Sequence, residues 1–159
     1  MTAVMKAVRD NDEARVKALI AGGADVDELD PNGDAPLVMA AYLGHTGIVQ
    51  ALLEAGADVR AVDPGMRATA LHAAAYAGRT EAARLLIQGG IDINKQGPEN
   101  GYTALHDAIW ENHVHTARVI IEAGADLTLK SHRGETPLDF ARAKRRSEIV
   151  TLIEHKLGR

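Results

Sequence analysis

One stretch decides the fold: Thr69-Ala70-Leu71-His72-Ala73-Ala74-Ala75-Tyr76-Ala77-Gly78. A close copy of it is Thr103-Ala104-Leu105-His106-Asp107-Ala108-Ile109-Trp110. Two altered copies are Ala35-Pro36-Leu37-Val38-Met39-Ala40-Ala41-Tyr42-Leu43-Gly44 and Thr136-Pro137-Leu138-Asp139-Phe140-Ala141. The chain is therefore built from repeats of one phrase, and a search for functional motifs has to begin from that fact.

A second phrase fixes the period of the repeat. It reads Ala24-Asp25-Val26, Ala57-Asp58-Val59, Ile91-Asp92-Ile93 and Ala125-Asp126-Leu127, and a glycine stands directly before each copy. Those glycines, at positions 23, 56, 90 and 124, are 33, 34 and 34 residues apart. A fixed period in this range is typical of a solenoid, in which each repeat is one supersecondary unit stacked on the next.

The repeated phrases resemble the ankyrin repeat. The copies that carry the resemblance most closely are Gly134-Glu135-Thr136-Pro137-Leu138 and Gly101-Tyr102-Thr103-Ala104-Leu105-His106-Asp107-Ala108. The resemblance implies an all-α ankyrin-repeat solenoid of about five helix-turn-helix units with short β-turn or hairpin connections. The short, single-module design is similar to free-standing bacterial ankyrin repeat proteins.

We expect one ankyrin repeat domain over residues 1–159. The expected units are an N-terminal cap repeat at 1–29, internal repeats at 30–62, 63–96 and 97–130, and a C-terminal cap repeat at 131–159. The turns that open the units at 63 and 97 are one residue longer than the turn at 30. Such lengthened loops either lie on the binding face or are tolerated insertions, because added loop length costs little free energy.

Composition narrows the class of protein. Without cysteine the chain has neither disulfides nor cysteine metal sites, which fits a reducing compartment. Charged residues enter too early at the N-terminus for a secretory signal. No apolar run approaches the roughly 20 residues that span a bilayer. We therefore expect a soluble, cytoplasmic, monomeric protein without membrane contact.

Charge is distributed unevenly. The net charge is −4, but the stretch from Lys130 onward carries +4 and residues 1–129 carry −8. A mostly acidic body argues against general binding of nucleic acid. The basic cluster of the last unit contains Arg142, Lys144, Arg145 and Arg146. It is interpreted either as a solvated cap face or as a patch for an acidic partner or phosphate.

Most of the repeated polar residues are predicted to be structural. Thr69, Thr103 and Thr136 stand where a hydroxyl caps a helix N-terminus. The resemblance implies that His72 and His106 hydrogen-bond neighbouring loop backbone. The aspartates of the second phrase, Asp25, Asp58, Asp92 and Asp126, suit turns in which the carboxylate accepts from the N–H two residues on.

Catalysis and metal binding find little support in the sequence. Neither a nucleophile-elbow motif nor a His-Glu-x-x-His motif nor a phosphate-binding glycine loop is present. His113 and His115 could ligate a metal from a loop, but His113 occupies a routine position between two helices and no third ligand is predicted nearby. We expect no enzyme, no cofactor and no metal.

Function is sought where the copies differ. Five residues after the leucine of the repeated phrase stand Tyr42, Tyr76 and Trp110, which are three of the five aromatic residues in the chain. In the ankyrin family this position faces the concave groove, and Tyr102 falls at a hairpin tip that the family also uses for contact. The rings are interpreted as an aromatic ladder for a partner. The alternative is that they only pack on one another and on the next helix.

The predicted function is protein–protein recognition by the concave helix face and the hairpin tips. The alternative is a regulatory module whose groove binds a small ligand and controls a partner protein. The predicted partner-binding residues are Tyr42, Leu43, Met66, Arg67, Tyr76, Asn100, Tyr102, Trp110, Glu111, Arg133 and Lys144, with Asn32 and Asp34 as further tip residues.

Overall fold

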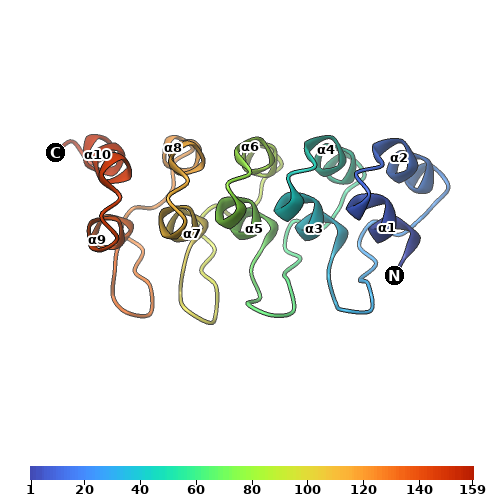
Figure 1. Cartoon of the computed structure of the whole chain (residues 1–159), viewed down its shortest axis with the longest axis horizontal. Helices are drawn as coiled ribbons and strands as arrows, with labels where there is room; N and C mark the ends of the chain where they lie inside the picture. Colours follow the sequence, from blue (N-terminus) through green and yellow to red (C-terminus); the bar gives the residue numbers. More distant parts are fainter.

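The computed structural model describes all residues from 1 to 159 as ten α-helices stacked in five layers (Figure 1). The helices are α1 (Ala3–Arg9), α2 (Glu13–Ala21), α3 (Pro36–Leu43), α4 (Thr46–Glu54), α5 (Ala70–Ala77), α6 (Thr80–Gln88), α7 (Ala104–Trp110), α8 (Val114–Glu122), α9 (Pro137–Ala143) and α10 (Ser147–Lys156). Odd-numbered helices form one row and even-numbered helices the other, with the termini at opposite ends (Figure 1). The predicted all-α solenoid is confirmed. No helix is both long and apolar enough to cross a membrane.

The first helix of a layer begins where the sequence predicts. Thr69, Thr103 and Thr136 each accept from the backbone N–H three residues on, and each forms a capping box with the residue at that position. Pro36 is the first residue of α3, where the missing N–H costs nothing. The predicted caps are therefore confirmed.

Histidines join successive layers. Nδ1 of His72 contacts the Thr69 hydroxyl at 2.9 Å and accepts from the Thr69 N–H, so Nε2–H donates to the Tyr102 carbonyl at 2.9 Å. His106 repeats this arrangement and reaches the Glu135 carbonyl at 3.1 Å. Burial lowers the pKa of both imidazoles, which keeps them neutral and suited to one acceptor and one donor role. The predicted loop contacts are confirmed.

The second phrase of the repeat also behaves as predicted. Each of its four aspartates accepts from the backbone N–H two residues on, at 2.9 Å: Asp25, Asp58, Asp92 and Asp126. Two of these turns also donate a hydrogen bond to the preceding layer, from the Asp58 N–H to the Asp27 carboxylate and from the Asp126 N–H to the Asn94 side-chain oxygen. The turns therefore support stacking as well as chain reversal.

One continuous apolar core of 34 buried residues runs through all five layers. Alanines of the odd-numbered helices, such as Ala40, Ala74, Ala108 and Ala141, are completely buried. Small side chains allow the helices of neighbouring layers to approach closely. The two rows of helices are thus packed into one rod rather than five independent units.

The second helix of the second layer, α4, spans Thr46–Glu54, so Gly47 lies in its first turn. A Cβ on Gly47 would collide with the carboxylate of Glu13. The glycine is therefore a close approach inside a helix and not a loop residue.

Five equivalent positions, one after each odd-numbered helix, adopt left-handed backbone conformations. Gly44 and Gly78 have φ values of 75° and 71°, Asn11 has a φ value of 53°, and Asn112 and Arg145 have φ values of 58°. Glycine and asparagine tolerate this conformation, whereas arginine is strained in it. Arg145 is exposed, and its side chain makes no hydrogen bond or ion pair within the chain.

We predict that Arg145→Gly stabilises the protein. Relief of left-handed strain is worth about 1–2 kcal/mol, and the entropy of glycine in the unfolded chain offsets part of it, leaving roughly 0.5–1 kcal/mol. Urea unfolding measures the change. Arg145→Ala is the matched control, because it removes the same charge and keeps the strain, so equal stabilisation by both variants would contradict the explanation.

Candidate binding groove

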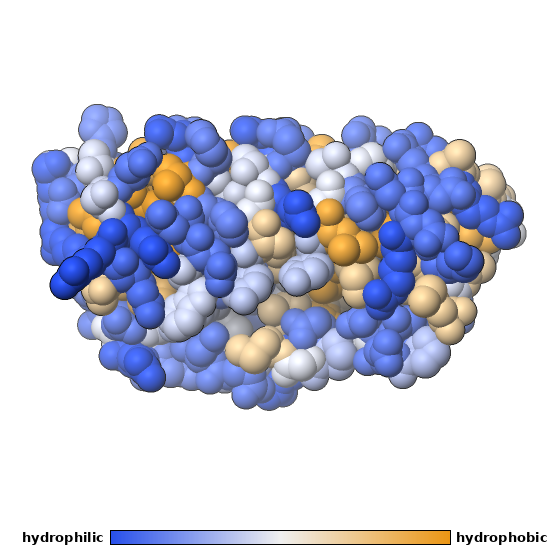
Figure 2. Space-filling model, in the orientation of Figure 1, coloured by the Kyte–Doolittle hydropathy of each residue, from blue (hydrophilic) through white to orange (hydrophobic).

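A groove crosses the second, third and fourth layers between the odd-numbered helices and the hairpins that precede them. Its volume is about 490 Å³. It is lined by Asp34, Val38, Met39, Tyr42, Asp63, Met66, Ala68, His72, Ala73, Tyr76, Gly97, Asn100, Tyr102, Asp107 and Trp110. Figure 2 shows pale residues in a hollow in the middle of the molecule, with strongly hydrophilic residues toward both sides.

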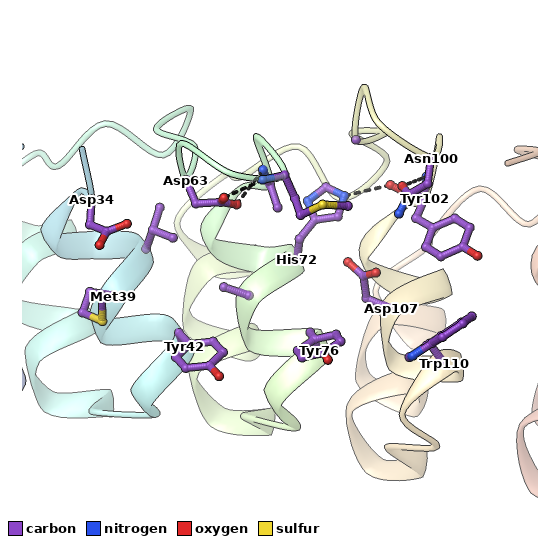
Figure 3. Close-up of a pocket in the computed structure, with 15 residues that line it drawn as sticks. Asp34, Met39, Tyr42, Asp63, His72, Tyr76, Asn100, Tyr102, Asp107 and Trp110 are labelled. Atoms are coloured by element: carbon purple, nitrogen blue, oxygen red, sulfur yellow. Dashed lines mark hydrogen bonds between the residues drawn. The ribbon is translucent and has the colours of Figure 1, made fainter. Parts of the chain in front are cut away.

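Nine of the lining residues form a three-by-three arrangement, since equal positions of successive layers lie in rows. The ring row is Tyr42, Tyr76 and Trp110; the floor row, three residues earlier, is Met39, Ala73 and Asp107; the hairpin row, at the base of each hairpin, is Asp34, Ala68 and Tyr102. Figure 3 shows Tyr42, Tyr76 and Trp110 at one height on neighbouring helices.

The third layer provides the depth of the groove. Its floor position is Ala73 and its hairpin position is Ala68, whereas the second layer has Met39 in the floor row and the fourth layer has Asp107 and Tyr102 in the floor and hairpin rows. Small residues in the centre between larger ones on either side leave a hollow. The shape therefore follows from two alanines that the sequence analysis did not single out.

The rings of the ring row face open space. Tyr42, Tyr76 and Trp110 are 47%, 46% and 42% exposed, and no ring of this row stacks on another. Aromatic side chains exposed to this extent are available as anchors for a binding partner.

The backbone of each ring residue is held by the following layer. Arg79 Nε donates to the Tyr42 carbonyl at 3.1 Å, His113 Nε2 reaches the Tyr76 carbonyl at 3.1 Å, and Arg146 donates to the Trp110 carbonyl at 2.6 Å. A Cβ on Gly44 or Gly78 would collide with Arg79 or His113. These contacts fix the position of the ring row relative to the stack.

Trp110 differs from the two tyrosines because it also belongs to an aromatic cluster. Its ring stacks on Phe140 with centroids 6.0 Å apart and lies 6.4 Å from Tyr102. Lys144 Nζ lies 3.9 Å from the centroid of the Trp110 ring, which is cation–π geometry. Trp110 therefore packs on other aromatic rings, whereas Tyr42 and Tyr76 stack on none.

Asp107 stands out chemically. It projects from α7 toward the third layer, beside His72 and Tyr102 (Figure 3). Burial raises the pKa of its carboxyl to about 8, and no hydrogen bond or charge within the chain counters this effect. A carboxyl that loses water without gaining a partner is expensive for the folded state.

The other two carboxylates of the groove are already engaged. Asp34 lies 3.7 Å from Arg9, and Asp63 accepts from the N–H groups of Gly65, Met66 and Ala68 at 2.8–2.9 Å. Lysine and arginine are absent among the lining residues, and the pKa of the single histidine, His72, is lowered by burial. The groove is therefore apolar with an acidic character.

The structure divides the predicted partner-binding residues into two groups. The groove brings together six of them: Tyr42, Met66, Tyr76, Asn100, Tyr102 and Trp110. It leaves five outside its lining: Leu43, Arg67, Glu111, Arg133 and Lys144. Arg67 instead pairs with Glu99 at 3.0 Å, and Lys144 covers Trp110. The tip residue Asp34 lines the groove and Asn32 does not.

Sequence reasoning missed the floor row. Met39, Ala73 and Asp107 occupy the position two residues after the repeated leucine, and its equivalent in the fifth layer is the buried Phe140. This position changes from copy to copy in chemistry and size, so the search for differences between copies that found the ring row would also have found the floor row.

Residues of two other candidate sites, the histidine pair at 113 and 115 and the basic cluster of the last unit, already make contacts within the chain. His113 contacts the Tyr76 carbonyl, and no group of three or more His, Cys, Asp or Glu side chains in the chain is arranged to hold a metal ion. In the basic cluster, Arg142 pairs with Glu154 at 2.7 Å and Arg146 donates to the Ile109 and Trp110 carbonyls. Lys144 lies over the Trp110 ring, and Arg145 is the one member of the cluster whose side chain has no such contact within the chain.

Five stacked helix pairs with capped first helices, hairpins and a groove on one side define the class of helical-repeat solenoids. The chain belongs to the ankyrin repeat family. The family model for ankyrin repeats, in three copies, matches residues 1–63 and 56–131. Ankyrin repeats are generally protein–protein interaction modules and are typically non-catalytic. No curated protein matches the chain.

We predict that Asp107→Asn removes a pH-dependent loss of stability. The folded chain retains a proton on Asp107 that the unfolded chain releases, since burial raises its pKa from 3.8 to about 8. The free energy of unfolding therefore falls as pH rises through this window, with the contribution fully present below about pH 4 and lost above about pH 8.

The charged and titratable groups that face Asp107 do not change the direction in which the free energy of unfolding depends on pH. They are His72 and Tyr76 on α5, Tyr102 and Asp63 in the hairpins, and Lys144, the residue directly after α9, on the far side of Trp110. Between about pH 5 and pH 8 the stability advantage of Asp107→Asn over the wild type should grow by more than about 1.4 kcal/mol, the worth of one pKa unit. Urea unfolding at both pH values measures it. Glu111→Gln, which removes an exposed carboxylate outside the groove, is the control, and parallel curves for wild type and Asp107→Asn would contradict the prediction.

Proposed function

We propose that this protein is a non-catalytic module that binds a partner protein through the groove and the adjoining hairpins. The observation that carries the proposal is the ring row: Tyr42, Tyr76 and Trp110 stand half-exposed along an apolar groove on successive layers of one rigid stack. Soluble proteins rarely leave large apolar rings in a row open to water without a use for them.

The free energy gained by covering the three rings is consistent with this role, but stable binding requires further contacts. Covering the exposed parts of the three rings would contribute roughly 7 kcal/mol of gross burial, at about 25 cal/mol/Å² and 150–250 Å² per ring. Loss of translational and rotational freedom costs about 4–15 kcal/mol. The rings are therefore anchors, and affinity depends on what the partner adds along the floor and hairpin rows.

A second candidate function is regulation by a small ligand held in the same groove. The volume of about 490 Å³ falls in the range of small-molecule sites, which is about 300–1,000 Å³. Native mass spectrometry of the protein purified from its own host discriminates the two functions, because a retained small molecule would favour the ligand and a bare chain with a captured protein would favour the partner.

The proposal also covers the repeat organisation, the compartment, the oligomeric state and the class of partner. The units at 1–29 and 131–159 act as cap repeats around internal repeats at 30–62, 63–96 and 97–130. The protein acts in the cytoplasm as a monomer, and its partner is a protein rather than nucleic acid. The acidic charge of residues 1–129 supports the last point.

We predict that Tyr42→Ala combined with Tyr76→Ala abolishes partner capture and changes the melting temperature little. Both rings are nearly half-exposed and stack on no other ring, so their loss removes contact surface rather than core. Trp110 is left intact because it packs on Phe140 and under Lys144. Affinity purification from the native host with each variant as bait measures capture.

Leu29→Ala is the matched control, since Leu29 is an exposed apolar residue outside the groove, at 55% exposure. It should leave capture unchanged. If the tyrosine variant retains its partners, the groove is not the binding surface; if it unfolds, the rings belong to the core.

A further inference from the structure

We propose that the groove receives a basic side chain, lysine or arginine, from an extended segment of the partner, with Asp107 as its counter-ion and Tyr76 and Trp110 as its walls. This inference rests on the proposed function and narrows the chemistry of the partner. The three residues come from two successive layers and line one continuous groove.

Charge complementarity is the first argument. The lining contains three carboxylates and neither lysine nor arginine. Arg9 and backbone N–H groups already occupy Asp34 and Asp63, so Asp107 is the carboxyl that has room for a partner. An acidic segment would oppose ionisation of Asp107 further, and a purely apolar segment would bury the carboxyl without a partner.

The walls give the second argument. The faces of tyrosine and tryptophan attract cations within about 6 Å of the ring centre. Lys144 already uses Trp110 in this way at 3.9 Å, together with Phe140 on the α9 side of the ring. The groove side of Trp110 and the ring of Tyr76 therefore offer a second cation the same kind of contact next to a carboxyl.

The shape of the third layer gives the third argument. Lysine and arginine have an apolar stem and a charged head. Ala68 and Ala73 leave space for the stem at the centre of the groove, and Met39 provides an apolar contact on the second-layer side. The head then reaches Asp107 on the fourth-layer side.

Ionisation of Asp107 should make the affinity for a basic segment depend on pH. A cation beside Asp107 favours the carboxylate, so binding below about pH 8 releases a proton from this group. Affinity for a basic segment should rise with pH up to that region. The other titratable or charged groups around the site are Asp34, Tyr42, Asp63, His72, Tyr76 and Tyr102 in the lining and Lys144 beyond Trp110.

A random dodecapeptide library displayed on phage tests the inference with the intact protein as bait. Wild-type protein should enrich peptides that share one lysine or arginine position. A retained peptide, resynthesised with norleucine at that position, should bind about tenfold more weakly, and a version with lysine and arginine exchanged tells which head group is preferred.

The variants separate the site from general electrostatics. Asp107→Asn should weaken the basic peptide about tenfold and remove its rise in affinity between about pH 6.5 and pH 8. Glu122→Gln, which removes an equal charge from the exposed surface of α8 outside the groove lining, should preserve both affinity and pH dependence. Circular dichroism verifies that each variant is folded.

The outcomes distinguish this inference from the proposed function. Peptides enriched without a basic position, or a basic position whose effect survives Asp107→Asn, overturn the role of Asp107 while leaving the groove as a binding surface. Enrichment that persists after the Tyr42→Ala and Tyr76→Ala changes, or no enrichment at all, counts against both.

Discussion

Stacking of one helix pair on the next is the constraint on which the rest of the structure depends. A single pair has no core of its own, because its buried face is completed by the alanines and leucines of its neighbours. The histidine bonds from His72 to the Tyr102 carbonyl and from His106 to the Glu135 carbonyl set the distance and register between layers. Equal sequence positions therefore become neighbours in space, which makes a groove out of residues that are about one repeat apart in the chain.

The same constraint connects the candidate binding surface to the stack. Arg79, His113 and Arg146 each belong to one layer and hold the backbone of the ring residue in the layer before it. Movement between layers would break these bonds and shift the rings relative to one another. A partner that contacts several rings at once would therefore stabilise the relative position of the layers, because it would bind the stacked form in preference to a loosened one.

The sequence predicted features that single repeats and the repeat period determine, such as helix caps and turns. It did not predict the hollow of the groove, which depends on the relative size of residues in three neighbouring layers. Caps at Thr69 and Thr103, histidine bonds and aspartate turns are short-range or fixed by the period, and all of them are present. The presence of the ring row in one groove also follows from the period. The hollow at Ala68 and Ala73 could not be read from the third repeat alone, because it exists only relative to larger residues on both sides. Arg67 lies outside the groove lining and pairs with Glu99 of the next hairpin, a contact that side-chain direction decides and periodicity does not.

Asp107 shows how to separate scaffold from function in a repeat protein. The scaffold does not need a carboxyl at this position, since Met39 and Ala73 occupy it in the two preceding layers and those layers fold with the same geometry. An unpaired carboxyl in an apolar groove costs free energy, and its raised pKa is the expression of that cost. A residue that destabilises its own fold, satisfies no neighbour and opens into a groove has the physical profile of a functional group. A partner that brought a positive charge or a hydrogen bond to the carboxyl would remove this cost, so under the proposal Asp107, more than the apolar rings, would constrain the chemistry of the partner.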